Sequence, residues 1–191
     1  MDEQSRIETR IETTEASARA NRVSWGSRLV AGIADGILSA ILMMGFMMAY
    51  SNAVGEGLTM PLKALGGLVY GVEALVAGST SMLAGAGIQL GFSIVLGILF
   101  ALCMSRRTSI VAALFAGLAI GVVIWVVMDL VVLPYMNPTM AARIALMPMA
   151  YFVAHLLFGI GLGLTPLFIR AFSGKVDDRR RVSRRTEALP A

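Results

Sequence analysis

The chain has 191 residues, of which 57% are hydrophobic and only 15% are charged, and its mean hydropathy is +0.77. Soluble domains contain roughly 25% charged residues, so this composition excludes an ordinary soluble domain and indicates a protein of the lipid bilayer. The formal net charge of +4 comes mostly from the two ends of the chain. We expect the basic C-terminal end to fix the membrane topology, with docking to anionic lipid as the alternative and with no nucleic-acid partner.

The chain contains one cysteine, Cys103, and one histidine, His155. A single cysteine cannot form an intrachain disulfide, and a single histidine cannot supply a bis-histidine haem site or a histidine-rich metal site. The sequence also has no Walker loop and no HExxH, GxSxG or CxxC motif. We therefore predict that the protein is not an enzyme, and we expect no catalytic residues, no cofactor and no metal.

In chain order, a tail over residues 1–28 mixes acidic and basic residues and lacks the apolar stretch of a secretory signal. Four apolar runs follow, at 29–50, 81–103, 108–133 and 144–169. Each run supplies the ~20 residues that a helix needs to cross a bilayer. We predict an all-α integral membrane protein, with four transmembrane helices in a domain over 29–172 and a basic tail over 173–191.

The connection between the first two runs contains a further apolar stretch at 60–78. Its apolar residues recur every three or four positions, as they do on one face of a helix, but Lys63 and Glu73 bracket only nine uncharged residues. A fifth crossing would also place the basic tail on the outer side. We therefore expect an interfacial or re-entrant helix here, with a true fifth span as the alternative.

Lysine and arginine are distributed unequally between the two sides of the predicted bundle. The loops 51–80 and 134–143 carry only Lys63 and Arg143. The other side carries Arg19, Arg22, Arg28, Arg106, Arg107, Arg170 and the basic tail. Because positively charged loops stay in the cytoplasm, we predict that residues 1–28 and 173–191 are both cytoplasmic.

Small residues at four-residue spacing mark each predicted span. Lipid gives helices no hydrophobic drive to associate, so close packing depends on small residues that let backbones approach. We predict packing seams at these pairs, although glycine is simply common in membrane helices: Gly32 and Gly36, Gly87 and Gly91, Gly117 and Gly121, and Gly159 and Gly163.

Two acidic residues lie within the predicted spans, where ionisable groups are costly and are candidates for function. We expect Asp35 to form a structural ion pair or a water contact at the inner face, with Arg28, Arg106 and Arg107 on the same side. A proton relay is the alternative. We expect Asp129 to pair with Arg143 and so to clamp the turn at 134–138.

His155 and Gln89 lie at comparable depth, near the membrane midplane. Gln89-x-x-x-Ser93-x-x-x-Gly97 and His155-x-x-x-Gly159-x-x-x-Gly163 have the same spacing, which suggests a duplicated two-helix unit. We expect a structural hydrogen bond between the histidine and the glutamine, with a buried proton or ligand site as the alternative.

The sequence resembles a family of uncharacterised four-helix bacterial inner-membrane proteins over about residues 30–170. The resemblance is carried by Gln89-L-G-F-S, Trp125, the run Leu133-Pro134-Y-M-Asn137-Pro138, and His155-L-L-F-Gly159-x-G-L-Gly163. It implies a multi-pass protein of the bacterial inner membrane. A second histidine is common in the family where this chain has Gln89, so a two-histidine site does not transfer, and the family supplies no activity.

Two functions remain as hypotheses. The first is a non-catalytic accessory or assembly subunit, which packs through its glycine faces against other membrane subunits or against itself. The second is a small homo-oligomeric transporter or channel, in which Gln89, His155 and Asp35 line a polar path.

Overall fold

The structure is a computed structural model that describes residues 25–105 and 107–173. The predicted tails therefore lie largely outside the described residues. The described part is helical and contains no strand, and four of its helical segments are long and apolar enough to cross a membrane. The predicted fold class, an all-α protein with four transmembrane helices, is confirmed.

The elements follow one another as α2 (Trp25–Ala53), α3 (Met60–Tyr70), the 3-10 helix η1 (Gly71–Leu75), α4 (Gly78–Cys103) and α5 (Ile110–Val127). The π-helix η2 (Met128–Val132), α6 (Leu133–Met136), α7 (Pro138–Leu146) and α8 (Pro148–Gly163) come next. After a turn at Leu164, helix continues over 165–173, so the last candidate span is Pro148–Ser173. The third candidate span, Ile110–Met136, runs through the π-helix without a break.

The last span begins four residues later than the sequence predicted. Residues 144–146 belong to the separate short helix α7, and Met147 has φ −142° and ψ 55°, outside the helical region. Pro148 then occupies the start of α8, where its missing N–H costs nothing. The predicted start at 144 is therefore wrong because the apolar run spans two helices.

The stretch predicted at 60–78 forms α3 and η1 and is not a fifth span. The 11 residues of α3 reach only ~16 Å at 1.5 Å per residue, too short for the ~30 Å hydrocarbon core. This helix packs closely on α4, because a Cβ atom on Gly66 would overlap the backbone of Ser81. It also contacts α7, where the amide of Asn137 donates to the Ala64 carbonyl oxygen at 2.9 Å.

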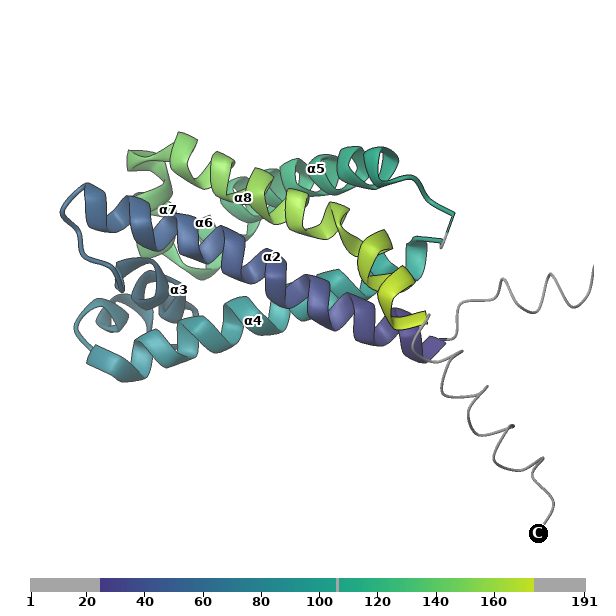
Figure 1. The fold of residues 1–191 in the computed structure, drawn as a ribbon. Coiled ribbons are helices and arrows are strands. Elements are labelled where there is room, and N and C mark those ends of the chain that lie inside the picture. Colours follow the sequence, from purple (N-terminus) through teal and green to yellow (C-terminus); the bar gives the residue numbers. More distant parts are fainter. Residues whose placement is uncertain (1–24, 106, 174–191) are drawn as a thin grey trace, which may run out of the picture.

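The four long segments form two hairpins that meet along one line of contact. In the first hairpin α2 packs on α4, in the second α5 packs on α8, and α2 and α8 join the two hairpins. Figure 1 shows this order, with α8 and α2 between α5 and α4. In the described ranges, α4 and α5 make no extended contact with each other. The bundle is therefore open on the side between these two helices.

Candidate functional site

The contact between α2 and α4 runs through small residues. A Cβ atom on Gly36 would lie 2.8 Å from Cα of Ile94, and one on Gly32 would lie 2.6 Å from Cα of Ile98. On the α4 side, the close approach uses Ser93 and Gly97. Gly32 and Gly36 thus lie at a helix crossing, as expected for a seam.

The contact between α5 and α8 has the same construction. A Cβ atom on Gly117 would lie 2.9 Å from the backbone nitrogen of Gly163, and one on Gly121 would overlap the His155 carbonyl oxygen. A Cβ atom on Gly159 would lie 2.9 Å from the carbonyl carbon of Gly117. These four glycines let the two backbones touch.

The predicted seam at Gly87 and Gly91 makes no close contact with another helix of the described residues. Both glycines are exposed, and no other described atom lies within 4 Å of the position that a Cβ atom would take, apart from their own helix. The close contacts of α4 instead use Gly85, which faces α3, and Ser93 and Gly97, which face α2. This prediction was wrong for packing inside the bundle because four-residue spacing marks a face without saying what covers it.

Asp35 is fully buried in the contact between α2 and α8. The Thr165 hydroxyl donates to one carboxylate oxygen, and the other has no hydrogen-bond partner in the described structure. The expected pair with Arg28 is not formed, because the Arg28 guanidinium donates to the Leu102 carbonyl oxygen at 2.8 Å. Arg106, one of the two other expected neighbours, lies outside the described residues. A buried threonine therefore supplies a partner for the carboxylate, where the sequence suggested an arginine or a water contact.

Arg143 is the centre of a buried cluster that the sequence did not predict. Its guanidinium pairs with Glu56, donates to the Ser51 hydroxyl at 3.1 Å, and donates to the Tyr151 hydroxyl at 3.0 Å. The predicted pair with Asp129 is wrong, since the guanidinium instead forms its ion pair with Glu56, in the connection after α2. The only signal in the sequence was that Glu56 and Arg143 both lie in loops assigned to the outer side.

Arg143 therefore does not pair with Asp129. Asp129 lies in the π-helix, it is 7% exposed, and neither carboxylate oxygen has a hydrogen bond with the described part of the chain. The indole of Trp125, four residues earlier, interacts with this carboxyl group without reaching hydrogen-bond geometry. A single π-helical turn within an α-helix contains one extra residue, and such turns often occur at functional sites.

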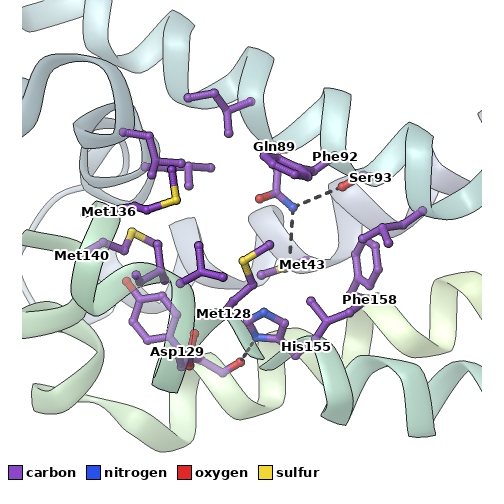
Figure 2. Close-up of a pocket in the computed structure, with 18 residues that line it drawn as sticks. Met43, Gln89, Phe92, Ser93, Met128, Asp129, Met136, Met140, His155 and Phe158 are labelled. Atoms are coloured by element: carbon purple, nitrogen blue, oxygen red, sulfur yellow. Dashed lines mark hydrogen bonds between the residues drawn. The ribbon is translucent and has the colours of Figure 1, made fainter. Parts of the chain in front are cut away.

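A cavity of about 310 Å³ brings several of the predicted polar residues together. It lies between α4 and the segment from α5 to α6, with α2 and α8 behind it and α3 at one end. Gln89, Ser93, Asp129, Tyr151 and His155 supply the polar part of its lining, and the remaining lining is apolar. Figure 2 shows the His155 ring and the Gln89 amide on opposite walls, with methionine side chains between them.

The predicted hydrogen bond between His155 and Gln89 is not formed. His155 Nδ1 lies 2.8 Å from the backbone oxygen of Tyr151, and the Gln89 amide donates to Ser93 Oγ at 3.4 Å and to Met43 Sδ at 3.5 Å. Gln89 on α4 bonds to its own helix and to α2, and His155 bonds to its own helix. The structure brings both residues to one cavity but does not join them.

The His155 bond fixes which nitrogen of the ring carries the proton. A backbone carbonyl can only accept a hydrogen bond, so Nδ1 donates to Tyr151 and the neutral ring keeps Nε2 as an acceptor. The Gln89 amide oxygen and the Asp129 carboxylate are also acceptors. The cavity wall therefore offers mainly acceptors to anything that enters it. Asp35 lies outside this cavity lining.

The four long apolar helices define the class, a helical multi-pass membrane protein. No protein-family model, no curated protein and no solved structure matches the chain. The four apolar helices agree with the resemblance seen in the sequence at the level of that class, and no comparison supports its specific residue pattern.

Proposed function

We propose that this chain is a non-catalytic accessory or assembly subunit that packs against another membrane protein. The observation that supports the proposal is the free face of α4, which carries the small residues Thr80, Ala84, Gly87 and Gly91. In lipid, such a face allows a second backbone to approach closely. No helix of the described chain covers Gly87 or Gly91, so this face is available to a partner.

We expect Gly87→Leu combined with Gly91→Leu to abolish association while the bundle stays folded, because leucine separates two packed backbones but meets open space within the chain. Tagged full-length protein is purified from native membranes, and the associated chains are identified. Gly45→Leu is the matched control, since Gly45 also has no described neighbour within 4 Å and lies on α2.

A partner retained by the α4 double variant and by the control alike would contradict the proposed face. Co-purification of a second, differently tagged copy of this chain, lost in the double variant, would identify the partner as the chain itself.

A small transporter or channel is the second candidate. It is supported by the polar cavity residues Gln89, Asp129 and His155, of which Asp129 and His155 are ionisable, because ionisable groups within a membrane mark ion or substrate paths. Liposomes with a trapped pH dye separate the two candidates. A flux that depends on His155 would favour the transporter, whereas the accessory role predicts no flux.

We propose that the protein lies in the bacterial inner membrane with both termini in the cytoplasm. Arg28 and Arg170 support this orientation, because each donates to a carbonyl oxygen near the connection between α4 and α5, at Leu102 and Thr108. These basic groups gather at one end of the bundle, as the cytoplasmic side requires. At the other end, Arg143 is buried and paired with Glu56.

We expect a cysteine at position 59, in a Cys103→Ala background, to react with an impermeant thiol reagent on intact cells. Thr59 lies in the connection before α3, at the end of the bundle opposite Arg28 and Arg170 (Figure 1). A cysteine at position 105, in the connection between α4 and α5, is the control and should react only after the cells are opened. The reverse pattern would overturn the orientation.

A further inference from the structure

We propose that the cavity between α4 and α5 binds a long-chain amine taken up from the bilayer, with its ammonium head at the wall that carries Asp129 and His155 (Figure 2). The proposal does not depend on the accessory role, because the free glycine face of α4 points away from the cavity. On α4 the cavity is lined by Gln89, Phe92 and Ser93, whereas Gly87 and Gly91 lie on the exposed side.

The hydrogen-bonding groups of the cavity wall favour a ligand whose head group carries hydrogen-bond donors. His155 Nε2 is an acceptor because Nδ1 donates to Tyr151, and the Gln89 amide uses its N–H group for Ser93 and Met43, which leaves its oxygen. Asp129 adds a carboxylate with no hydrogen bond to the described residues. An ammonium head has three N–H donors and no acceptor, so it suits the acceptors of Asp129 and His155 on one wall, while the Gln89 oxygen lies on the opposite wall (Figure 2).

The acidic residue in the cavity wall favours a ligand with a positively charged head group. Asp129 is the acidic residue of the lining, and the lining contains no lysine or arginine. Arg143, a buried basic residue at this end of the bundle, is held by Glu56, Ser51 and Tyr151. An unpaired carboxylate in a membrane is costly, and hydrogen bonds between charged groups are about twice as strong as neutral ones. An ammonium group would supply the missing partner.

The apolar lining and the open side accommodate an alkyl chain. The side chain of Phe92 is 54% exposed and that of Met136 is 65% exposed, so the cavity reaches the surface that faces lipid. Phe158 and Met128 line it further inside, and aromatic faces also attract cations. The volume of about 310 Å³ lies at the lower end of the range for small-molecule sites, ~300–1,000 Å³.

The test uses the full chain in lipid vesicles and a dodecylamine probe that carries a photoreactive diazirine in its alkyl chain. Probes with the same chain and an alcohol or a carboxylate head are compared with it. After illumination, mass spectrometry identifies the labelled residues. We expect the amine probe to label Phe92 and Met136, excess dodecylamine to displace it, and the alcohol probe to label them at least about tenfold less.

The variants separate the charge at the cavity from membrane carboxylates in general. Asp129→Asn keeps the shape and removes the charge, and we expect labelling by the amine probe to fall about tenfold. Asp35→Asn is the matched control and should leave labelling unchanged, because Asp35 is buried between α2 and α8. The double variant at Gly87 and Gly91 should also leave labelling unchanged, which separates this site from the proposed partner face.

Equal labelling by the amine, alcohol and carboxylate probes would overturn the proposal, since the cavity would then accept any alkyl chain. Labelling of lipid-facing residues such as Leu99 and Val111 as strong as that of Phe92 would overturn it too. The comparison of head groups uses the wild-type protein, so it decides the question even if Asp129→Asn does not fold.

Discussion

Gly36→Leu is expected to destroy the fold, at a cost of at least ~3 kcal/mol in the free energy of unfolding. A Cβ atom at this position would overlap the Ser93 carbonyl oxygen and would lie 2.8 Å from Cα of Ile94. Both obstacles are backbone atoms, which cannot rotate away as a flexible side chain can. Overpacking that side chains can absorb already costs ~1–3 kcal/mol, and here α2 and α4 must separate.

Gly45→Leu is the matched control, because it makes the same change on the same helix where a Cβ atom meets open space. The free energy of unfolding of both variants is measured in mild detergent by titration with a denaturing detergent. We expect Gly45→Leu to differ from wild type by less than about 0.5 kcal/mol, as is usual at exposed positions. Equal losses in the two variants would mean that α2 and α4 do not touch at Gly36.

Arg143→Met is expected to cost about 3–5 kcal/mol, because it strands a buried ion-pair partner. The guanidinium joins the ends of α2 and α8 to α7 by its contacts with Ser51, Tyr151 and Glu56. Methionine keeps much of the length of the side chain, so the loss comes from the polar contacts. The free energy of unfolding is again the measured quantity.

Glu56→Gln and the double variant complete the cycle for Arg143. We expect the double variant to lose less than the sum of the two single variants, because it leaves no stranded charge. Lys63→Met is the control for loss of a basic residue at the same end of the bundle. Strict additivity of Arg143→Met and Glu56→Gln would show that the two side chains do not interact.

The four spans were predictable from the sequence, because a bilayer imposes one length and one composition on every crossing helix. The boundary at Pro148 was not predictable from hydropathy, since α7 and α8 are both apolar and only the backbone of Met147 separates them. Hydropathy measures how apolar a stretch is, whereas the helix boundary depends on backbone angles.

The polar contacts were harder to predict, because each depends on how a loop or a crossing places two distant residues. Arg143 was assigned to Asp129, the acid nearest to it in sequence, but the connection after α2 brings Glu56 to it instead. Asp35 was assigned to arginines or to water at its own end of the bundle, but the crossing of α2 and α8 brings it to Thr165.

The repeated spacing of the two halves predicted the helix pairs better than it predicted the site. Gly36 approaches the backbone of Ser93 on α4 as Gly117 approaches the backbone of Gly159 on α8, and these are matching positions of the repeated spacing. The two halves differ in how they meet each other, since α2 packs on α8 while α4 and α5 stay apart in the described structure. Because this difference separates Gln89 from His155, spacing alone could place them at one depth but could not join them.

The opening between α4 and α5 also changes what a binding constant for this cavity would measure. An alkyl chain that moves from lipid into the cavity exchanges one apolar environment for another, because lipid tails are as apolar as leucine. Burial of the chain therefore contributes little, and the head group decides which molecules stay. Occupancy should follow the mole fraction of the ligand in the membrane, so diluting a fixed amount of ligand with more lipid should empty the site even when the volume of water is unchanged.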